Sequence, residues 1–185
     1  MQIITLGSHQ KELIEQAAVL LVRGFQENWP ESWPDLEAAR AEVLESLQPD
    51  RIALAAIDET GTLAGWIGAI YEYGGRAWEL HPLVVDPDRQ GRGIGRALVE
   101  ALEKELRHRG AVTVYLGSDD ENDTTSLGGV DLYDDLWGKI AAIQNLKGHP
   151  YSFYHKLGYQ IVGVIPDANG LGKPDILMAK RLIPW

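Results

Sequence analysis

The chemistry most evident in the chain lies in a loop that could bind a negatively charged ligand. An apolar strand and a polar turn precede it, and a helical pattern follows it. The loop comprises Gln90, Gly91, Arg92, Gly93, Ile94, Gly95 and Arg96. The first N–H groups of a helix lack intrahelical partners, glycine lets the backbone approach a phosphate, and the two arginines add positive charge. We predict a pyrophosphate ligand here.

The glycine spacing excludes two common phosphate motifs. The chain contains no Gly-x-x-x-x-Gly-Lys-Ser/Thr run, so it has no Walker A loop. A dinucleotide fingerprint needs its third glycine three residues after the second, and Arg96 stands at that position. Taken alone, the segment could also be a strand-to-helix turn without a ligand.

Two motifs in order resemble those of the GCN5-related N-acetyltransferase (GNAT) superfamily. Gln90-x-x-Gly93-x-Gly95 resembles the Gln/Arg-x-x-Gly-x-Gly/Ala loop that holds the pyrophosphate of acetyl-CoA in that family. The run from Tyr154 to Tyr159 resembles the later Tyr-x-x-x-Gly-Phe/Tyr motif, whose tyrosine lies beside the coenzyme sulfur. Alone, Tyr154 would read as a core tyrosine. Together the motifs favour an acyl-CoA transferase.

The elements around these motifs alternate between helical and strand patterns. We expect helices at 10–26, from the Asp35 cap to before Pro49, from the glycine loop to Gly110, at 132–146 and from Pro150. Strands are expected at 51–57, 63–71, 78–85, 111–116, 159–165 and 176–181. The predicted fold is a single α/β domain over residues 1–185, with a GNAT-type mixed, mostly antiparallel sheet flanked by helices.

Composition narrows the functional class further. The net charge of −10 disfavours nucleic acid and acidic membrane surfaces and favours cationic partners. The chain has no cysteine, and its histidines show no metal-ligand spacing, so we expect no metal site. No signal peptide is evident, and no apolar run approaches the roughly 20 residues of a membrane helix. We expect a cytoplasmic protein.

Longer motifs resemble a narrower family, the aminoglycoside 6′-N-acetyltransferases. They are Trp78-Glu79-Leu80-His81-Pro82-Leu83-Val84-Val85, Tyr115-Leu116-Gly117-Ser118-Asp119-Asp120, Ile143-Gln144-Asn145-Leu146, His149-Pro150-Tyr151 and Gly172-Lys173-Pro174-Asp175-Ile176. The resemblance implies acetyl transfer from acetyl-CoA to the 6′-amine of an antibiotic, and with it antibiotic resistance. It also implies a homodimer, and pairing of the pantetheine arm with the backbone of Leu83, Val84 and Val85.

Four residues could carry the transfer chemistry. Glu79 and His81 stand two apart on one strand, so their side chains share a face, and either could accept the amine proton. Pro82 favours a splayed or bulged strand, in which the N–H of Leu83 or Val84 could stabilise the oxyanion. Tyr154 is the candidate donor to the leaving thiolate. Glu79 could instead only neutralise the substrate cation, and His81 could be structural.

The predicted acceptor site is acidic and aromatic. Its residues are Trp29, Glu79, Asp119, Asp120 and Asp175. The two adjacent aspartates could instead form a turn or a helix cap, Asp175 could brace the Lys173-Pro174 turn, and Trp29, like Trp33, could be core packing. The loop 121–130 is variable in the family and leaves the antibiotic spectrum open. Two other functions stay open: acetylation of a polyamine, metabolite or protein amine, and acyl-CoA sensing without turnover.

Overall fold

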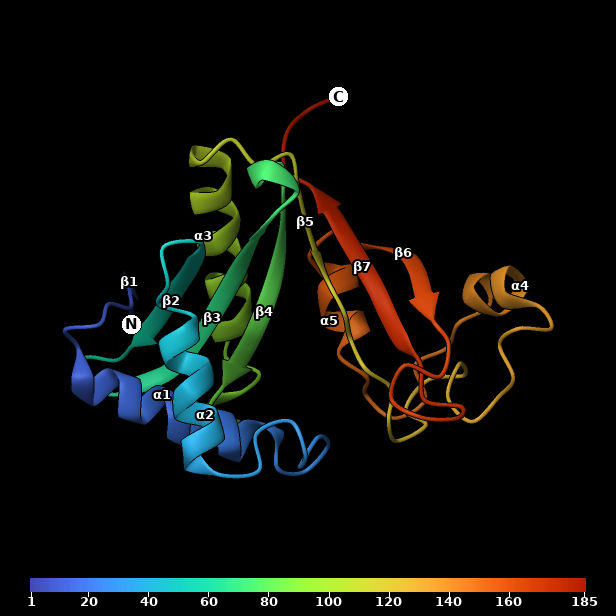
Figure 1. The fold of residues 1–185 in the computed structure, drawn as a ribbon, viewed down its shortest axis with the longest axis horizontal. Helices are drawn as coiled ribbons and strands as arrows, with labels where there is room; N and C mark the ends of the chain where they lie inside the picture. Colours follow the sequence, from blue (N-terminus) through green and yellow to red (C-terminus); the bar gives the residue numbers. More distant parts are fainter. The chain divides into compact units, whose positions relative to one another are not determined.

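The computed structural model describes residues 1–185 and divides into two compact units (Figure 1). Unit 1 comprises residues 1–114 and 182–185, and unit 2 comprises residues 115–181. Unit 1 holds β1 (Gln2–Thr5), α1 (Lys11–Phe25), α2 (Leu36–Glu45), β2 (Arg51–Ile57), β3 (Leu63–Glu72), the 3₁₀ turn η1 (Tyr73–Gly75), β4 (Ala77–Val85), the 3₁₀ turn η2 (Pro87–Arg89) and α3 (Ile94–His108). Strand β5 (Thr113–Leu116) leads into unit 2, which holds α4 (Leu136–Ala141), α5 (Tyr151–Lys156), β6 (Gln160–Ile165) and β7 (Asp175–Arg181).

Unit 1 is built on the antiparallel run β1-β2-β3-β4. Helices α1 and α2 cover one face of these strands and α3 covers the other (Figure 1). Trp66 is fully buried on the α1 side, where its indole N–H donates to the Ala17 carbonyl over 3.3 Å. The Asp35 carboxylate caps α2 by accepting the Ala38 N–H over 2.9 Å, as predicted. Strand β4 carries three of the four predicted catalytic residues, Glu79, His81 and Leu83.

Unit 2 has its own small core beneath the antiparallel pair of β6 and β7. After β5 the chain continues antiparallel to β7, through hydrogen bonds between Ser118 and Ile176 and a bridge between Asp119 and Asp175. Leu127, Tyr159 and Met178 are fully buried in this unit.

The predicted α/β fold class, with mostly antiparallel strands and flanking helices, is confirmed. None of the helices has both the length and the apolar character needed to cross a membrane. The single-domain assignment stays a prediction.

One element prediction was wrong, and one strand was not predicted. The expected helix over 132–146 is helical only from Leu136 to Ala141. Beyond that helix the backbone turns to the loop at 124–126, where the Leu146 N–H donates to the Thr124 carbonyl and the Gln144 N–H to the Ser126 hydroxyl. The N-terminal strand β1 was not predicted, because four residues are too short to show a strand pattern.

Candidate active site

The glycine loop presents an open helix N-terminus, as a bound pyrophosphate would require. Gly91 and Gly93 have φ angles of 73° and 82°, in the left-handed region that glycine adopts without strain. A Cβ at either position would meet no atom within 4 Å, so the backbone is accessible from outside. The first N–H groups of the 15-residue helix α3 follow directly. The loop therefore fits the phosphates of acetyl-CoA.

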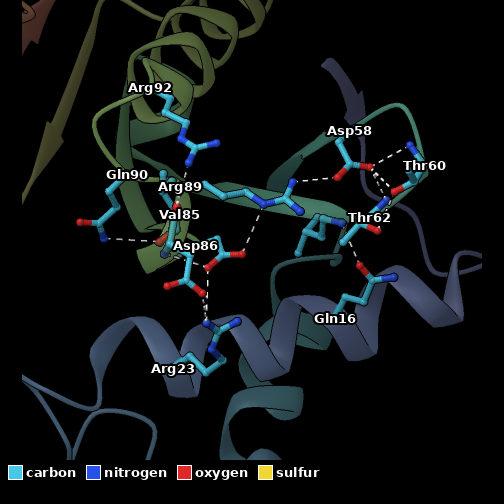
Figure 2. Close-up of polar contacts among 12 residues, drawn as sticks. Gln16, Arg23, Asp58, Thr60, Thr62, Val85, Asp86, Arg89, Gln90 and Arg92 are labelled. Atoms are coloured by element: carbon cyan, nitrogen blue, oxygen red, sulfur yellow. Dashed lines mark hydrogen bonds and ion pairs between the residues drawn. The ribbon is translucent and has the colours of Figure 1, made fainter.

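A network of charges anchors the turn before this loop (Figure 2). Arg89 lies between two carboxylates, donating to Asp58 over 2.8 Å and pairing with Asp86 at 3.6 Å. On the other side, Arg23 of α1 pairs with Asp86 at 3.5 Å and Asp88 at 3.1 Å. The Thr60 hydroxyl, Arg89 and the Thr62 N–H hold the pKa of the Asp58 carboxyl well below its usual range. The turn is thus tied both to the β2–β3 hairpin and to α1.

The predicted phosphate contacts from side chains have local partners of their own. The Gln90 amide donates to the Val85 carbonyl over 3.5 Å, and Arg92 to the Asp88 carbonyl over 3.4 Å (Figure 2). Arg96 is exposed and lies 3.5 Å from Glu100. These long, exposed contacts are weak and can be exchanged for contacts with a phosphate.

Strand β4 has the predicted bulge at its proline. Ile67 is paired with Leu83 and Ala69 with Leu80, so Gly68 faces both His81 and Pro82. A Cβ on Gly68 would collide with the backbone carbonyl of His81, which explains why glycine stands there. A bulge interrupts regular pairing and re-aims the residues around it. Val84 is buried, whereas Leu83 and Val85 are half-buried.

His81 has a carboxylate partner that the sequence reasoning missed. Its Nε2 lies 3.7 Å from an oxygen of Glu42 on α2, and its ring centroid lies 5.9 Å from that of Trp33. Burial of the ring opposes charging, but the carboxylates of Glu42 and Glu79 outweigh it, so the pKa of His81 is raised. The interaction with His81 lowers the pKa of Glu42 despite its burial. The available signal was Glu42 itself, a carboxylate one helical turn after buried Ala39.

Of the two nearby tryptophans, Trp33 is the one beside His81. Trp29 is half-buried with its ring centroid 5.7 Å from that of Phe25, and its buried indole N–H has no hydrogen-bond partner. A buried donor without a partner is costly unless a ligand or water supplies an acceptor. The structure thus leaves this indole N–H without an acceptor.

In unit 2, Tyr154 lies in α5 as a buried phenol. Its side chain packs edge-on against Phe153 and Tyr159, with ring centroids 5.0 and 5.6 Å away. Burial raises the pKa of the Tyr154 phenol well above its usual value, because the phenolate would lose its hydration. The hydroxyl therefore stays protonated at neutral pH and can donate a hydrogen bond.

Asp119 and Asp175 lie close together in the structure, whereas Asp120 is buried in a different environment. The first two face each other across an antiparallel bridge, and Asn169 donates to the Asp119 carboxylate over 2.5 Å. Gly117 leaves room for the Asp175 carboxylate, since a Cβ there would lie 2.5 Å from it. Asp119 is half-buried, which leaves its carboxylate within reach of a cation.

Asp120 is fully buried and its carboxylate is already saturated. One oxygen accepts the N–H and hydroxyl of Thr124 and the other those of Thr125, over 2.7–2.8 Å. Burial opposes ionisation, but these four donors outweigh it and lower the pKa of Asp120. Of the alternatives weighed from the sequence, this geometry is that of a turn-forming aspartate. Direct contact with a substrate would require breaking these bonds.

The fold and the loop are those of an acyl-CoA-dependent acetyltransferase, and comparison with known proteins agrees. The family model described as the acetyltransferase (GNAT) family matches residues 14–138, which is more than half of the chain. The chain belongs to this family.

Solved structures of aminoglycoside acetyltransferases match the whole chain. One is an aminoglycoside 6′-N-acetyltransferase complexed with coenzyme A, with 49% identity, a TM-score of 0.93 and coverage of 100% of this chain and 99% of that one. Another, the aminoglycoside 6′-N-acetyltransferase from Enterococcus faecium, has 48% identity and a TM-score of 0.90 at the same coverage. The mycothiol acetyltransferase of Propionibacterium freudenreichii is 42% identical over 65 residues, 34% of this chain, and the match spans about a fifth of that relative's length.

Proposed function

We propose that this protein transfers the acetyl group of acetyl-CoA to the 6′-amine of aminoglycoside antibiotics. The observation that carries the proposal is the 49% identity over the whole chain to an aminoglycoside 6′-N-acetyltransferase with coenzyme A bound. Similarity at that level and coverage extends beyond the glycine loop to the acidic segments of unit 2. Fold-level kinship alone would support only an acetyltransferase of unspecified substrate.

Unit 1 is proposed to hold the donor. The N–H groups at the start of α3, together with residues 90–96, bind the pyrophosphate, and the backbone of Leu83, Val84 and Val85 pairs with the pantetheine arm. The open Cβ positions of Gly91 and Gly93 support this assignment. The bulge at His81 and Pro82 supports a role for the Leu83 N–H in stabilising the oxyanion that forms at the thioester carbonyl.

The reaction is proposed as a direct attack of the amine on the thioester. A carbon–nitrogen bond forms, the carbon–sulfur bond breaks, the amine gives up one proton and the departing thiolate takes one up. Glu79, with His81, neutralises the substrate ammonium group or accepts its proton. Tyr154 donates to the thiolate sulfur, which its protonated state supports.

The acceptor is proposed to be bound through its positive charges. Asp119 and Asp175, adjacent across their bridge, form one anionic contact, and Glu79 forms another. Trp29, with its buried indole N–H lacking a partner, and the neighbouring Trp33 provide aromatic faces for a sugar ring. Asp120 contributes through the loop that it holds and not by direct contact.

The proposal is tested by thiol release from acetyl-CoA with kanamycin A, which carries a 6′-amine, and with a matched aminoglycoside that carries a 6′-hydroxyl. Spermidine and a peptide amine serve as acceptors for the competing acetyltransferase functions. Rapid release with the 6′-amino compound alone establishes the reaction and its position. Coenzyme A binding without release for any acceptor would indicate a sensor, and release with spermidine or the peptide alone would indicate another amine substrate.

We further infer a cytoplasmic homodimer that confers resistance. The family resemblance of the sequence supports the homodimer and the resistance. Light scattering of the purified protein should give about twice the 20.5 kDa of one chain. Expression in a susceptible bacterium should raise the inhibitory concentration of 6′-amino aminoglycosides and leave that of 6′-hydroxyl analogues unchanged.

A further inference from the structure

We propose that His149 is a positioning residue that holds the Asp119 backbone and the start of helix α5 in one fixed arrangement. The inference rests on the proposed function, in which Asp119 binds the acceptor and Tyr154 of α5 serves the leaving thiolate. The hydrogen bonds of the His149 ring are with the backbone, not with the Asp119 carboxylate or the Tyr154 hydroxyl. His149 acts through the two segments that carry them.

The contacts of His149 reach both segments. Its side chain is only 2% exposed, and its Nε2 lies 3.1 Å from the Asp119 carbonyl oxygen. Its Nδ1 accepts the backbone N–H of Tyr151, the first residue of α5, over 3.1 Å. One imidazole thus links the end of a strand to the beginning of a helix.

These contacts determine the tautomer of the ring. Because Nδ1 accepts a hydrogen bond, it carries no proton, and the proton of the neutral ring must be on Nε2, which donates to Asp119. A protonated ring would place an N–H of Nδ1 against the N–H of Tyr151. Burial lowers the pKa of His149, which agrees with a neutral ring at physiological pH.

The helix end explains why a histidine is needed. The first N–H groups of a helix need partners from outside it, and Pro150 at the cap position makes no side-chain hydrogen bond. His149 supplies the acceptor that the cap lacks. Tyr154 follows one turn later on the same short helix, so the start of α5 sets where its phenol lies.

A second side chain locks the backbone of His149. Asn145 accepts the His149 N–H over 2.8 Å and donates to the His149 carbonyl over 2.8 Å and to the Ser152 hydroxyl over 2.7 Å. The ring therefore cannot shift without breaking this turn as well. A ring fixed at its backbone and at both nitrogens is suited to setting the relative position of the groups that it contacts.

Two substitutions separate the two contacts. In His149→Asn, the amide oxygen stands near the Nδ1 position and still accepts the Tyr151 N–H, but the donor to Asp119 is lost. In His149→Gln, the amide N–H reaches toward Asp119, but the acceptor for Tyr151 is lost. The control is His155→Gln, which changes an exposed histidine of the same helix.

We expect His149→Asn to raise the KM for kanamycin A about tenfold with kcat within about twofold, because the acceptor contact is disturbed. We expect His149→Gln to lower kcat about tenfold with that KM nearly unchanged, because the start of α5 is disturbed. The control variant should change neither. Equal changes of both parameters in both variants would overturn the proposal and leave His149 a general stability residue.

Two measurements need no turnover, so they separate a failure of this inference from a failure of the proposed function. Ring-¹⁵N NMR of the wild-type protein should show a neutral His149 protonated on Nε2, and a ring protonated on Nδ1 would refute the inference. Hydrogen exchange of the Tyr151 amide should be accelerated in His149→Gln and unchanged in His149→Asn. The same acceleration in both variants would also refute it. If the NMR and exchange results are as expected but kanamycin A is not acetylated, only the proposed substrate is overturned.

Discussion

At the scale of single residues, His81 and Glu42 form a charge pair whose members shift each other's pKa in opposite directions. The pKa of His81 is raised and that of Glu42 is lowered, with 42% and 20% of the two side chains exposed. A raised histidine pKa contributes stability below 6.5 that is lost as pH rises through the folded value. A lowered glutamate pKa contributes stability above 4.5 that is lost as pH falls through the folded value. The pair therefore stabilises fully between pH 4.5 and 6.5, and its contribution is lost as pH moves through either folded value.

Removing the carboxylate charge of Glu42 should weaken the pair and lower the pKa of His81. In Glu42→Gln we expect a loss of about 0.5 kcal/mol at pH 6, typical of a partly exposed pair, and a smaller loss at pH 9. A proton NMR titration of the His81 ring measures the pKa directly, and urea unfolding at the two pH values measures the stability. A His81 pKa that stays the same or rises in the variant would contradict the assignment.

Glu79 provides a sharper test of acceptor binding. Glu79→Gln keeps the shape of the side chain and removes its charge, so the KM for kanamycin A should rise about tenfold or kcat should fall about tenfold. Coenzyme A affinity, measured by calorimetry, should stay within about twofold of the wild-type value. Glu72→Gln near the end of β3 is the matched control. Weaker coenzyme A binding in Glu79→Gln would place Glu79 on the donor side instead.

The sequence predicted two features of the candidate site well, because both depend on local backbone. The glycine loop and the bulge at Pro82 are properties of consecutive residues, and both were recognised from them. The Glu42–His81 pair was missed because it depends on how α2 packs against β4. Asp120 could not be distinguished from Asp119 by sequence, since the full burial of Asp120 and the partial exposure of Asp119 follow from the path of the loop at 120–125.

At the scale of elements, Gly68 shows how a strand is adapted to the bulge opposite it. Its missing side chain leaves space for the His81 carbonyl, so Gly68→Ala should force β3 and β4 apart. We expect a loss of about 2 kcal/mol in the free energy of unfolding, measured with urea, and a reduced kcat.

Gly163→Ala is the control for this prediction. Gly163 also stands beside a register shift, in β6, but a Cβ there would meet only the Leu177 side chain at 4.0 Å. We expect this variant to remain within about 0.5 kcal/mol of the wild type. A tolerated alanine at position 68 would mean that the bulge is not rigid.

The acidic loop of unit 2 depends on the Asp120 carboxylate. Asp120→Asn replaces one of two accepting oxygens by an NH₂ group, which then faces the N–H and hydroxyl of a threonine. We expect a loss of about 2 kcal/mol and faster hydrogen exchange confined to residues 121–126. Glu121→Gln, a neighbouring charge change, should leave both quantities unchanged. Unaltered exchange in Asp120→Asn would show that the loop is held by other contacts.

Most elements could be predicted because each carries its own periodic pattern or cap. Strand β2 was predicted at its observed bounds, and the limits of α1, β3, β4 and β6 were predicted to within a residue. The structure of segment 132–146 could not be predicted in this way. The backbone N–H groups of its last residues donate to a loop about twenty positions earlier and not to carbonyls within a helix. Local helix propensity does not report hydrogen bonds between residues that are distant in the sequence.

At the scale of the whole molecule, charge should govern acceptor affinity. With a net charge of −10, the protein should bind a polycationic aminoglycoside more weakly as salt screens the attraction. We expect the KM for kanamycin A to rise several-fold between 20 and 500 mM sodium chloride, measured by thiol release. The same rise should not appear in kcat. A KM independent of salt would contradict an acidic acceptor site.

The covalent path of the chain has one further consequence. The chain leaves unit 1 after Val114 and returns at Leu182. Leu182 donates its N–H to the Val112 carbonyl over 2.8 Å, and Arg107 holds the Leu182 carbonyl over 2.9 Å. Unit 2 is therefore an insertion, and the two segments of unit 1 that flank it are hydrogen-bonded to each other. We expect such a segment to be exchangeable, so that a chimera with residues 115–181 grafted from a relative should still fold and bind coenzyme A, with an altered preference for the acceptor amine.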